Sequence, residues 1–180
     1  MNDHTTKTQL AHQYPNLFQE TTWNSVQVKF QLLDNTLPQH LITNVNITPR
    51  LGDRWLIIRL SNGDWEIPGG TLELGEDYLT AARRELLEEA GARLLSFQLF
   101  GAWRCFSLAA KPYRPHLPWP KSYRVVGVGE VELTGQPENP ADGEQVVAVE
   151  AVTLETVMER FLSIERSDLA ELYHLAATLE

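Results

Sequence analysis

Residues 70–92 constrain the fold and chemistry of this chain more than any other segment. Asp77 is a favourable N-cap and Gly91 a favourable helix stop, which together predict a helix from about Tyr78 to Ala90. Three apolar residues recur at helical spacing and are expected to face the core: Leu79, Ala82 and Leu86. The polar face of this helix then carries the functional signal.

Three glutamates occupy one side of the predicted helix, because Glu85, Glu88 and Glu89 stand at positions i, i+3 and i+4. Their like charges repel, and Arg84 can compensate one of them at most, whereas a divalent cation would neutralise two. Oxygen ligands without His or Cys favour Mg²⁺ or Mn²⁺ over zinc. Because Mg²⁺ held by carboxylates usually bridges to substrate phosphates, the pattern predicts a site for a phosphate ester or phosphoanhydride.

The approach to the helix fits the same purpose. Gly69 and Gly70 follow a short strand that Pro68 ends or places at an edge. Paired glycines let the backbone run close to a ligand, or present a carbonyl to a metal, where a side chain would obstruct it. Gly75 and Glu76 then provide a tight entry to the helix.

This segment resembles the signature of the Nudix hydrolase superfamily, which includes MutT-like proteins: G-x5-E-x7-R-E-U-x-E-E-x-G-U, with U an aliphatic residue. The matching residues are Gly70, Glu76, Arg84, Glu85, Leu86, Glu88, Glu89, Gly91 and Ala92. Only Ala92 departs from the pattern, since it is smaller than the usual aliphatic residue at a position that packs. The strand before the segment and the elements after it also look like this family, whereas residues 1–24 and 109–121 match nothing in it.

The resemblance implies a role for each matched residue. Divalent metal, Mg²⁺ or alternatively Mn²⁺, is expected on Glu85, Glu88 and Glu89 with the carbonyl of Gly69. Arg84 is expected to orient the glutamates and Glu76 to support the loop. Gly70 and Gly91 are expected to support the backbone conformation of the motif. The reaction implied is attack of water on a phosphorus of a nucleoside diphosphate linked to another group.

The general base that takes the proton from this water is open between two places. Glu85 and Glu88 are candidates on the helix. The other place is the later loop 134–144, where the candidates are Glu138, Asp142 and Glu144. Glu144 ranks first in the loop because it borders the next strand, and an ordinary acidic surface loop is the competing interpretation.

The leading function is hydrolysis of a nucleoside triphosphate, an oxidised one included, to the monophosphate and pyrophosphate. ADP-ribose, dinucleoside polyphosphates and nucleotide sugars stay open as substrates of the same reaction. A non-catalytic nucleotide sensor is a second alternative, and an isoprenoid diphosphate isomerase using Cys105 is a third. Candidates for substrate binding outside the motif are Trp103, Arg104 and Tyr123, although each has a structural interpretation.

The rest of the sequence predicts an α+β fold in which a mixed β-sheet forms an α/β/α sandwich. Strands and helices do not alternate regularly, as they would in a doubly wound parallel sheet. We expect a single domain at 25–180, preceded by an N-terminal arm at 1–24. Strands are expected at 26–32 (ending near Asp34), around 45–47 and at 55–60 as a hairpin, at 65–67, 94–108, 123–133 and 145–152, and helices at 154–162 and 167–179.

Composition limits the partners. The chain has 24 acidic and 15 basic side chains and a formal charge of -9, which disfavours binding to duplex nucleic acid or anionic membranes. No apolar stretch approaches a membrane span, the first eight residues are polar, and the single cysteine, Cys105, cannot form an internal disulfide. A cytoplasmic protein is therefore expected, and its arm could mediate a homodimer.

Overall fold

The computed structural model describes residues 9–33, 37–141 and 143–179, and these residues build one nine-stranded mixed sheet. The predicted strand end near Asp34 and the loop candidate Asp142 lie outside the described residues. The strands are β1 (Thr21–Trp23), β2 (Val26–Leu32), β3 (Ile42–Leu51), β4 (Arg54–Leu60), β5 (Trp65–Glu66), β6 (Gly69–Thr71), β7 (Ala92–Ser107), β8 (Lys121–Leu133) and β9 (Val146–Val152).

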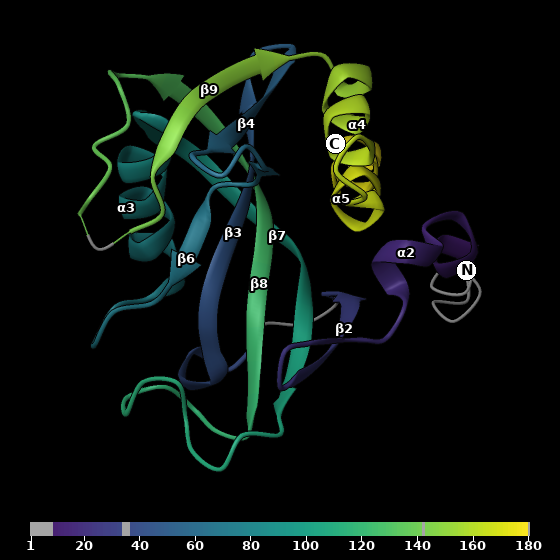
Figure 1. Cartoon of the computed structure of the whole chain (residues 1–180), viewed down its shortest axis with the longest axis vertical. Coiled ribbons are helices and arrows are strands. Elements are labelled where there is room, and N and C mark those ends of the chain that lie inside the picture. The colour runs from purple at the N-terminus through teal and green to yellow at the C-terminus, as the bar shows by residue number, and fades with distance from the viewer. Residues whose placement is uncertain (1–8, 34–36, 142, 180) are drawn as a thin grey trace.

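Helices cover both faces of this sheet (Figure 1). Helix α3 (Tyr78–Ala90) lies on one face, where it packs with buried residues such as Val45 and Leu56. Helices α4 (Leu154–Leu162) and α5 (Ser167–Thr178) lie on the other. The predicted fold class, a mixed β-sheet in an α/β/α sandwich, is confirmed.

The order of the strands is β1-β2-β7-β8-β3-β4-β5, with β6 beside β3 and β9 beside β4. Strands β3 and β8 run parallel, and every other pair in this order is antiparallel. The predicted hairpin around Gly52 exists but is short, since only Arg50 with Trp55 and Leu51 with Arg54 form its pairs. Both strands are buried along most of their length, so each takes further neighbours in the middle of the sheet instead of extending the hairpin.

Helix α3 has the predicted bounds and the predicted caps. The Asp77 carboxylate accepts a hydrogen bond from the backbone N–H of Thr80 at 2.8 Å, and Gly91 adopts a left-handed conformation with φ of 57°. A side chain at Gly91 would also collide with the backbone of residues 135–136. The cap at Asp77 therefore sets where the helix begins, and Gly91 sets where it ends.

Loss of the N-cap gives a first test of this account. Asp77→Ala removes one acceptor from the first turn of α3, and we expect it to lower the free energy of unfolding by about 1 kcal/mol. Thermal or denaturant unfolding measures the effect. Asp53→Ala is the matched control, because the Asp53 carboxylate is almost fully exposed in a turn. Equal stability of the two variants would contradict the capping role.

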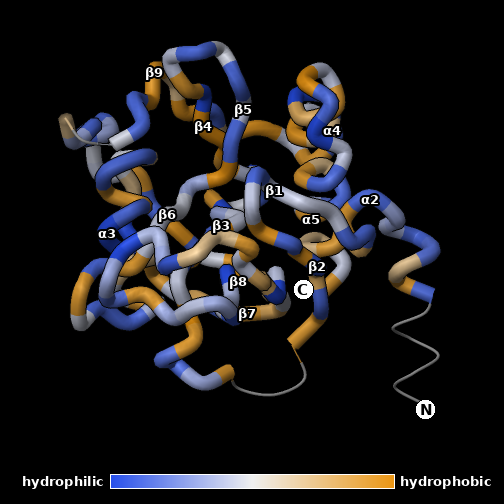
Figure 2. The backbone as a smooth tube through the Cα atoms, turned by 60° about the horizontal axis from the view of Figure 1, so that its bottom comes forward, coloured by the Kyte–Doolittle hydropathy of each residue, from blue (hydrophilic) through white to orange (hydrophobic). Residues whose placement is uncertain are grey.

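The N-terminal segment packs on α5, as Figures 1 and 2 show for helix α2 (Pro15–Phe18). Tyr14 and Leu17 are buried in the core on the α4 and α5 side. The Tyr14 hydroxyl lies 2.9 Å from His174 Nδ1, and Glu171 accepts a hydrogen bond from the backbone N–H of Leu17 at 2.8 Å. After α2, β1 pairs with β2 as an edge strand, so the N-terminal segment forms part of the sheet.

Among the described residues, no helix has both the length and the apolar character that crossing a membrane requires.

Candidate active site

The glutamate face of α3 lies against the paired glycines of β6. Glu85 is buried, and a side chain added at Gly70 would occupy the same space as the Glu85 carboxylate. The Glu89 carboxylate accepts a hydrogen bond from the backbone N–H of Gly69 at 2.9 Å. Glycine at these two positions therefore lets the backbone of β6 reach the carboxylates of the helix.

Arg84 joins the other carboxylates of the segment. Its Nε and Nη2 donate to the two oxygens of Glu76, both at 3.0 Å, which is a bidentate pair. Its Nη1 donates to Glu85 at 2.8 Å and to Glu88 at 3.2 Å, while Nη2 also reaches the carbonyl of Thr71 at 3.3 Å. One half-buried guanidinium thus fixes the loop before the helix and two of its three glutamates.

The pKa values of the glutamates shift in different directions. Burial raises the pKa of Glu85 despite the neighbouring Arg84. Burial also raises the pKa of Glu89 to about 8, since the hydrogen bond from Gly69 only partly offsets it and the charges of Glu85 and Glu144 add to the rise. The pKa of Glu76 is lowered, because the hydrogen bonds from Arg84 and the loop outweigh its burial. Among the described residues, no ion pair with a basic side chain offsets the charge of Glu89.

These residues suit a hard divalent cation. All the donors are carboxylate or carbonyl oxygens, the kind that Mg²⁺ and Mn²⁺ prefer, and a cation would relieve the unfavourable burial of Glu89. Within the described part of the chain, no three acidic, His or Cys side chains converge closely enough to enclose a metal as they stand. Glu85 and Glu88 face Arg84 instead, so binding a cation requires them to turn towards Glu89.

The loop between β8 and β9 is attached to the C-terminal end of α3. The backbone N–H groups of Thr134 and Gly135 donate to the carbonyl of Gly91, and that of Asn139 donates to the carbonyl of Glu88. The Asn139 side chain also bonds both backbone groups of Val146. These contacts hold the end of the loop, and with it Glu144, beside the glutamates.

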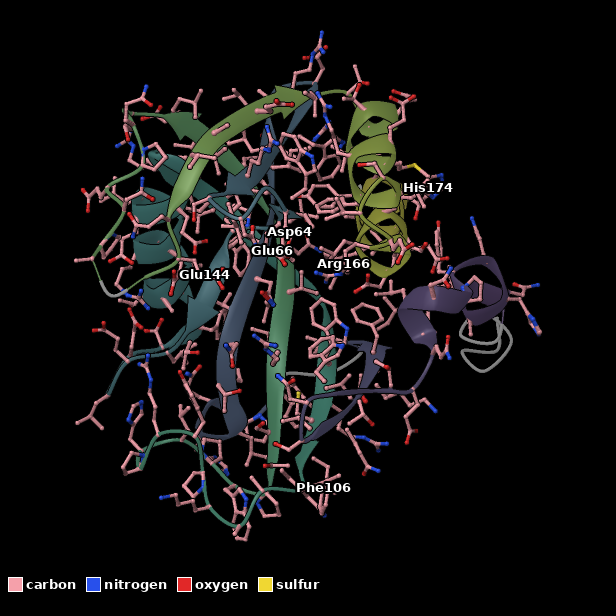
Figure 3. All side chains as sticks on the ribbon, viewed as in Figure 1. Asp64, Glu66, Phe106, Glu144, Arg166 and His174 are labelled. Atoms are coloured by element: carbon pink, nitrogen blue, oxygen red, sulfur yellow. The ribbon has the colours of Figure 1, made fainter. Side chains whose placement is uncertain are left out.

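Of the three candidate bases in this loop, only Glu144 is seen to lie at the cavity. Glu144 lies close enough to raise the pKa of Glu89 and borders the same cavity as Gly69. In Figure 3 it projects beside α3 and β6. Glu138 is exposed and does not line that cavity, and Asp142 lies outside the described residues.

A cavity of about 750 Å³ begins at Gly69 and Glu144 and continues along the sheet face that α5 covers. Its middle is bordered by Glu66 and Arg166, which form an ion pair at 3.1 Å and lie next to each other in Figure 3. Its far end is lined by Trp23, Trp103 and Arg124. The volume is sufficient for a nucleotide-sized ligand. None of the three glutamates lines the cavity itself, but Glu89 adjoins it through the hydrogen bond from Gly69.

The structure separates the predicted substrate-binding residues. Trp103 lines the cavity, whereas Arg104 and Tyr123 are register partners whose side chains point to the opposite face, as strand alternation requires. They border a second pocket of about 440 Å³ instead. Arg124 and Glu66 also line the cavity, although the sequence did not single them out. The pairing of Arg124 with Trp103 places Arg124 on the cavity face, and this register is not visible in the sequence.

Gly70 offers a test of the contact between β6 and α3. Gly70→Ala places a methyl group where the Glu85 carboxylate lies, so Glu85 must move, and we expect turnover to fall at least about tenfold while the protein stays folded. Steady-state kinetics and circular dichroism measure the two effects. Gly135→Ala is the control, because no atom lies within 4 Å of its added methyl group. Full activity of Gly70→Ala would show that the position of Glu85 is unimportant.

Comparison with known proteins identifies the family. A model of the NUDIX domain matches residues 42–173. The chain belongs to the Nudix family. Nudix hydrolases generally require divalent metal ions, in keeping with the oxygen ligands gathered along α3. The match leaves out α2, β1 and β2.

Individual relatives are more distant. The chain is 40% identical to a MutT-like protein of Streptomyces ambofaciens over 68 residues, 37% of this chain and 44% of that protein. It is 38% identical to the m7GpppN-mRNA hydrolase NUDT17 of Xenopus laevis over 65 residues, 35% of this chain and 22% of that protein. The matched regions thus span less than half of these two curated relatives. Both similarities support the family and leave the substrate open.

The structure also resembles solved Nudix proteins. A mutant of the pyrophosphohydrolase BsRppH of Bacillus subtilis aligns with a TM-score of 0.55 and 22% identity over 82% of this chain and 92% of its own. At this identity the likeness establishes the fold alone.

Proposed function

We propose that this Nudix protein hydrolyses a phosphoanhydride bond of a nucleoside diphosphate linked to a further group. The leading substrate is a nucleoside triphosphate, an oxidised one included, cleaved to the monophosphate and pyrophosphate. The observation that carries the proposal is the row of three glutamates, joined to Arg84 and β6, next to a nucleotide-sized cavity that Gly69 of β6 and Glu144 line. Phosphates of a nucleotide at this end of the cavity would lie beside Gly69, whose backbone N–H donates to Glu89.

Glu85, Glu88, Glu89 and the carbonyl of Gly69 would hold Mg²⁺, or alternatively Mn²⁺. When bound, the ion would polarise the phosphate oxygens and lower the pKa of a coordinated water. Arg84 would keep Glu85 and Glu88 at the correct side of the helix through the contacts it already makes. Its pair with Glu76 would hold the loop before the helix in place.

Glu144 would act as the general base. It takes a proton from the attacking water as the water oxygen forms a bond to phosphorus and the bond to the bridging oxygen breaks, so that pyrophosphate leaves. Its position at the cavity beside Gly69 supports this role, and the attachment of its loop to α3 would maintain the position. Glu85 and Glu88 fit the role less well because both already contact Arg84.

The isomerase alternative has less support from the site. Cys105 is buried, and its thiol donates to the carbonyl of Trp103 at 3.5 Å. It does not border the cavity at Gly69 and Glu144, whereas a catalytic thiol would have to contact the substrate there. Full activity of a Cys105→Ala variant would exclude this alternative.

The experiment that tests the proposed function is an activity panel with Mg²⁺. It contains nucleoside triphosphates, oxidised deoxynucleotides, ADP-ribose, dinucleoside polyphosphates and nucleotide sugars, with products separated by chromatography. We expect a preferred triphosphate that yields monophosphate and pyrophosphate, and we expect EDTA to abolish its hydrolysis. Preference for ADP-ribose or a nucleotide sugar would move the protein to that substrate class. Nucleotide binding without turnover would indicate a sensor.

A further inference from the structure

The far end of the cavity contains a polar group with little compensation. Arg124, on β8, lines the cavity, and its Nε is buried without a hydrogen-bond partner. In the orientation that satisfies both ends of the Asn44 amide, Asn44 accepts a hydrogen bond from Arg124 Nη2 at 3.2 Å. No carboxylate of the described chain forms an ion pair with Arg124, whereas nearby Arg166 pairs with both Glu66 and Asp168. Arg124 is thus a half-buried cation with capacity for a further acceptor.

Trp23 lies against this guanidinium, and Trp103 lies against Trp23. Its carbon lies 5.3 Å from the ring centroid of Trp23, and the Trp23 and Trp103 rings are 5.9 Å apart. Trp103 is buried, whereas Trp23 is half-exposed at the cavity. Trp23 belongs to β1, outside the part of the chain that the NUDIX model matches. The N-terminal segment therefore supplies a flat apolar surface that the matched region does not contain.

The distance between the two ends of the cavity fits a nucleoside. Gly69 is the register partner of Asn46, Asn46 is the partner of Val126, and Arg124 lies two residues before Val126. With strands about 4.8 Å apart and about 3.3 Å per residue along each, the backbones of Gly69 and Arg124 are about 12 Å apart. A nucleotide whose phosphates lie at Gly69, beside Glu89, would extend its base to Arg124 and Trp23.

We propose that Arg124 and Trp23 form a nucleobase site that selects 6-oxopurine nucleotides, those of guanine and hypoxanthine, over adenine nucleotides. This inference rests on the proposed function in that it takes the ligand to be a nucleotide. Arg124 donates to the carbonyl O6, and Trp23 packs against the ring.

Selectivity follows from the chemistry of the two bases. A guanidinium has only donors, and the O6 and N7 acceptors of guanine are its commonest partners among base edges. Adenine keeps N7 but presents an amino donor in place of O6, so it sets one donor of Arg124 against another donor and leaves that N–H without an acceptor. Stacking on an aromatic ring adds affinity for every base and discriminates little between them. Arg124 is therefore the selective group, and Trp23 contributes general affinity.

Equilibrium binding tests the site without catalysis. We would titrate the full chain with GMP, IMP and AMP by calorimetry, in the absence of added metal. GMP and IMP are expected to bind at least about tenfold more tightly than AMP, because a good contact between an arginine and a base edge discriminates by roughly this factor. IMP distinguishes the contribution of O6 from that of the 2-amino group of guanine, because hypoxanthine has O6 and lacks the amino group. Equal binding of GMP and AMP would overturn the proposal.

Variants assign the effect to residues. Arg124→Gln is expected to abolish the preference for GMP over AMP, and Arg124→Lys, which keeps the charge if the first variant is unstable, should weaken it. Trp23→Ala should weaken the binding of all three nucleotides about equally and leave the preference for GMP over AMP in place. Arg104→Gln is the matched control, because Arg104 is on the neighbouring strand and its side chain points to the other face. Arg124 variants that are folded and keep the preference would refute its role.

Turnover of GTP and ATP with Mg²⁺ separates the two proposals. Selective binding of GMP and IMP by a chain that hydrolyses neither triphosphate would support the base site and overturn a nucleoside triphosphate as the leading substrate. Hydrolysis of both triphosphates at the same kcat/KM, together with unselective binding, would support the activity and overturn the base site.

Discussion

Replacing Glu88 or Glu89 with glutamine is expected to lower turnover by at least about a hundredfold while leaving the fold intact. Loss of a residue that only supports a metal ligand commonly costs up to about a hundredfold, so loss of a ligand itself should cost no less. The fold should survive because the amide oxygen of glutamine can still accept the bonds from Gly69 and Arg84. In Glu89→Gln, a neutral group also replaces a carboxylate whose burial is unfavourable.

Kinetics at saturating Mg²⁺ and thermal unfolding measure these two variants. Glu159→Gln is the control, since Glu159 lies exposed on α4 and distant in the fold from α3. Binding of Mn²⁺, followed by electron paramagnetic resonance, should weaken in both variants and stay unchanged in the control. Normal turnover in either variant would exclude that glutamate from the site.

Removal of Arg84 has the largest expected effect on stability. Arg84→Ala breaks the bidentate pair with Glu76 and the contacts to Glu85 and Glu88, leaving three carboxylates without their shared cation. Breaking a buried ion pair typically costs about 3–5 kcal/mol, and Arg84 is only partly buried, so we expect a loss of about 3 kcal/mol. Turnover should fall as well, because the glutamates lose the group that orients them.

Arg83→Ala is the matched control for this experiment. Arg83 precedes Arg84 on the same helix but its side chain is exposed, so its loss should change the free energy of unfolding by no more than about 0.5 kcal/mol. Denaturant unfolding without metal compares the two variants directly. A similar small loss in both would mean that the Arg84 contacts contribute little to stability.

The expected cytoplasmic location, the homodimer and the boundary between arm and domain stay predictions. The same holds for the roles of the glutamates and Arg84, for which the structure supplies geometry and the variants above supply the test. The similarity to Nudix proteins supports the reaction class, and the nucleotide panel is needed to identify the substrate.

Features that depend on local interactions could be predicted from the sequence. The bounds of α3 follow from Asp77 and Gly91, which act on backbone groups within one turn. The row of three glutamates follows from the helical repeat alone. Strands β7 and β8 were also predicted to within about two residues, because runs of apolar and β-branched residues between turn signals are sufficient to mark them.

Features that depend on strand register were decided only by the tertiary structure. Trp103, Arg104 and Tyr123 were grouped because they lie close in the sequence or carry suitable side chains, yet the pairing of β7 with β8 turns Trp103 to the cavity and the other two away. The same pairing brings Arg124 to the cavity. A shift of one residue in register would exchange the two faces, and register is set by contacts between distant segments, so local sequence patterns cannot specify it.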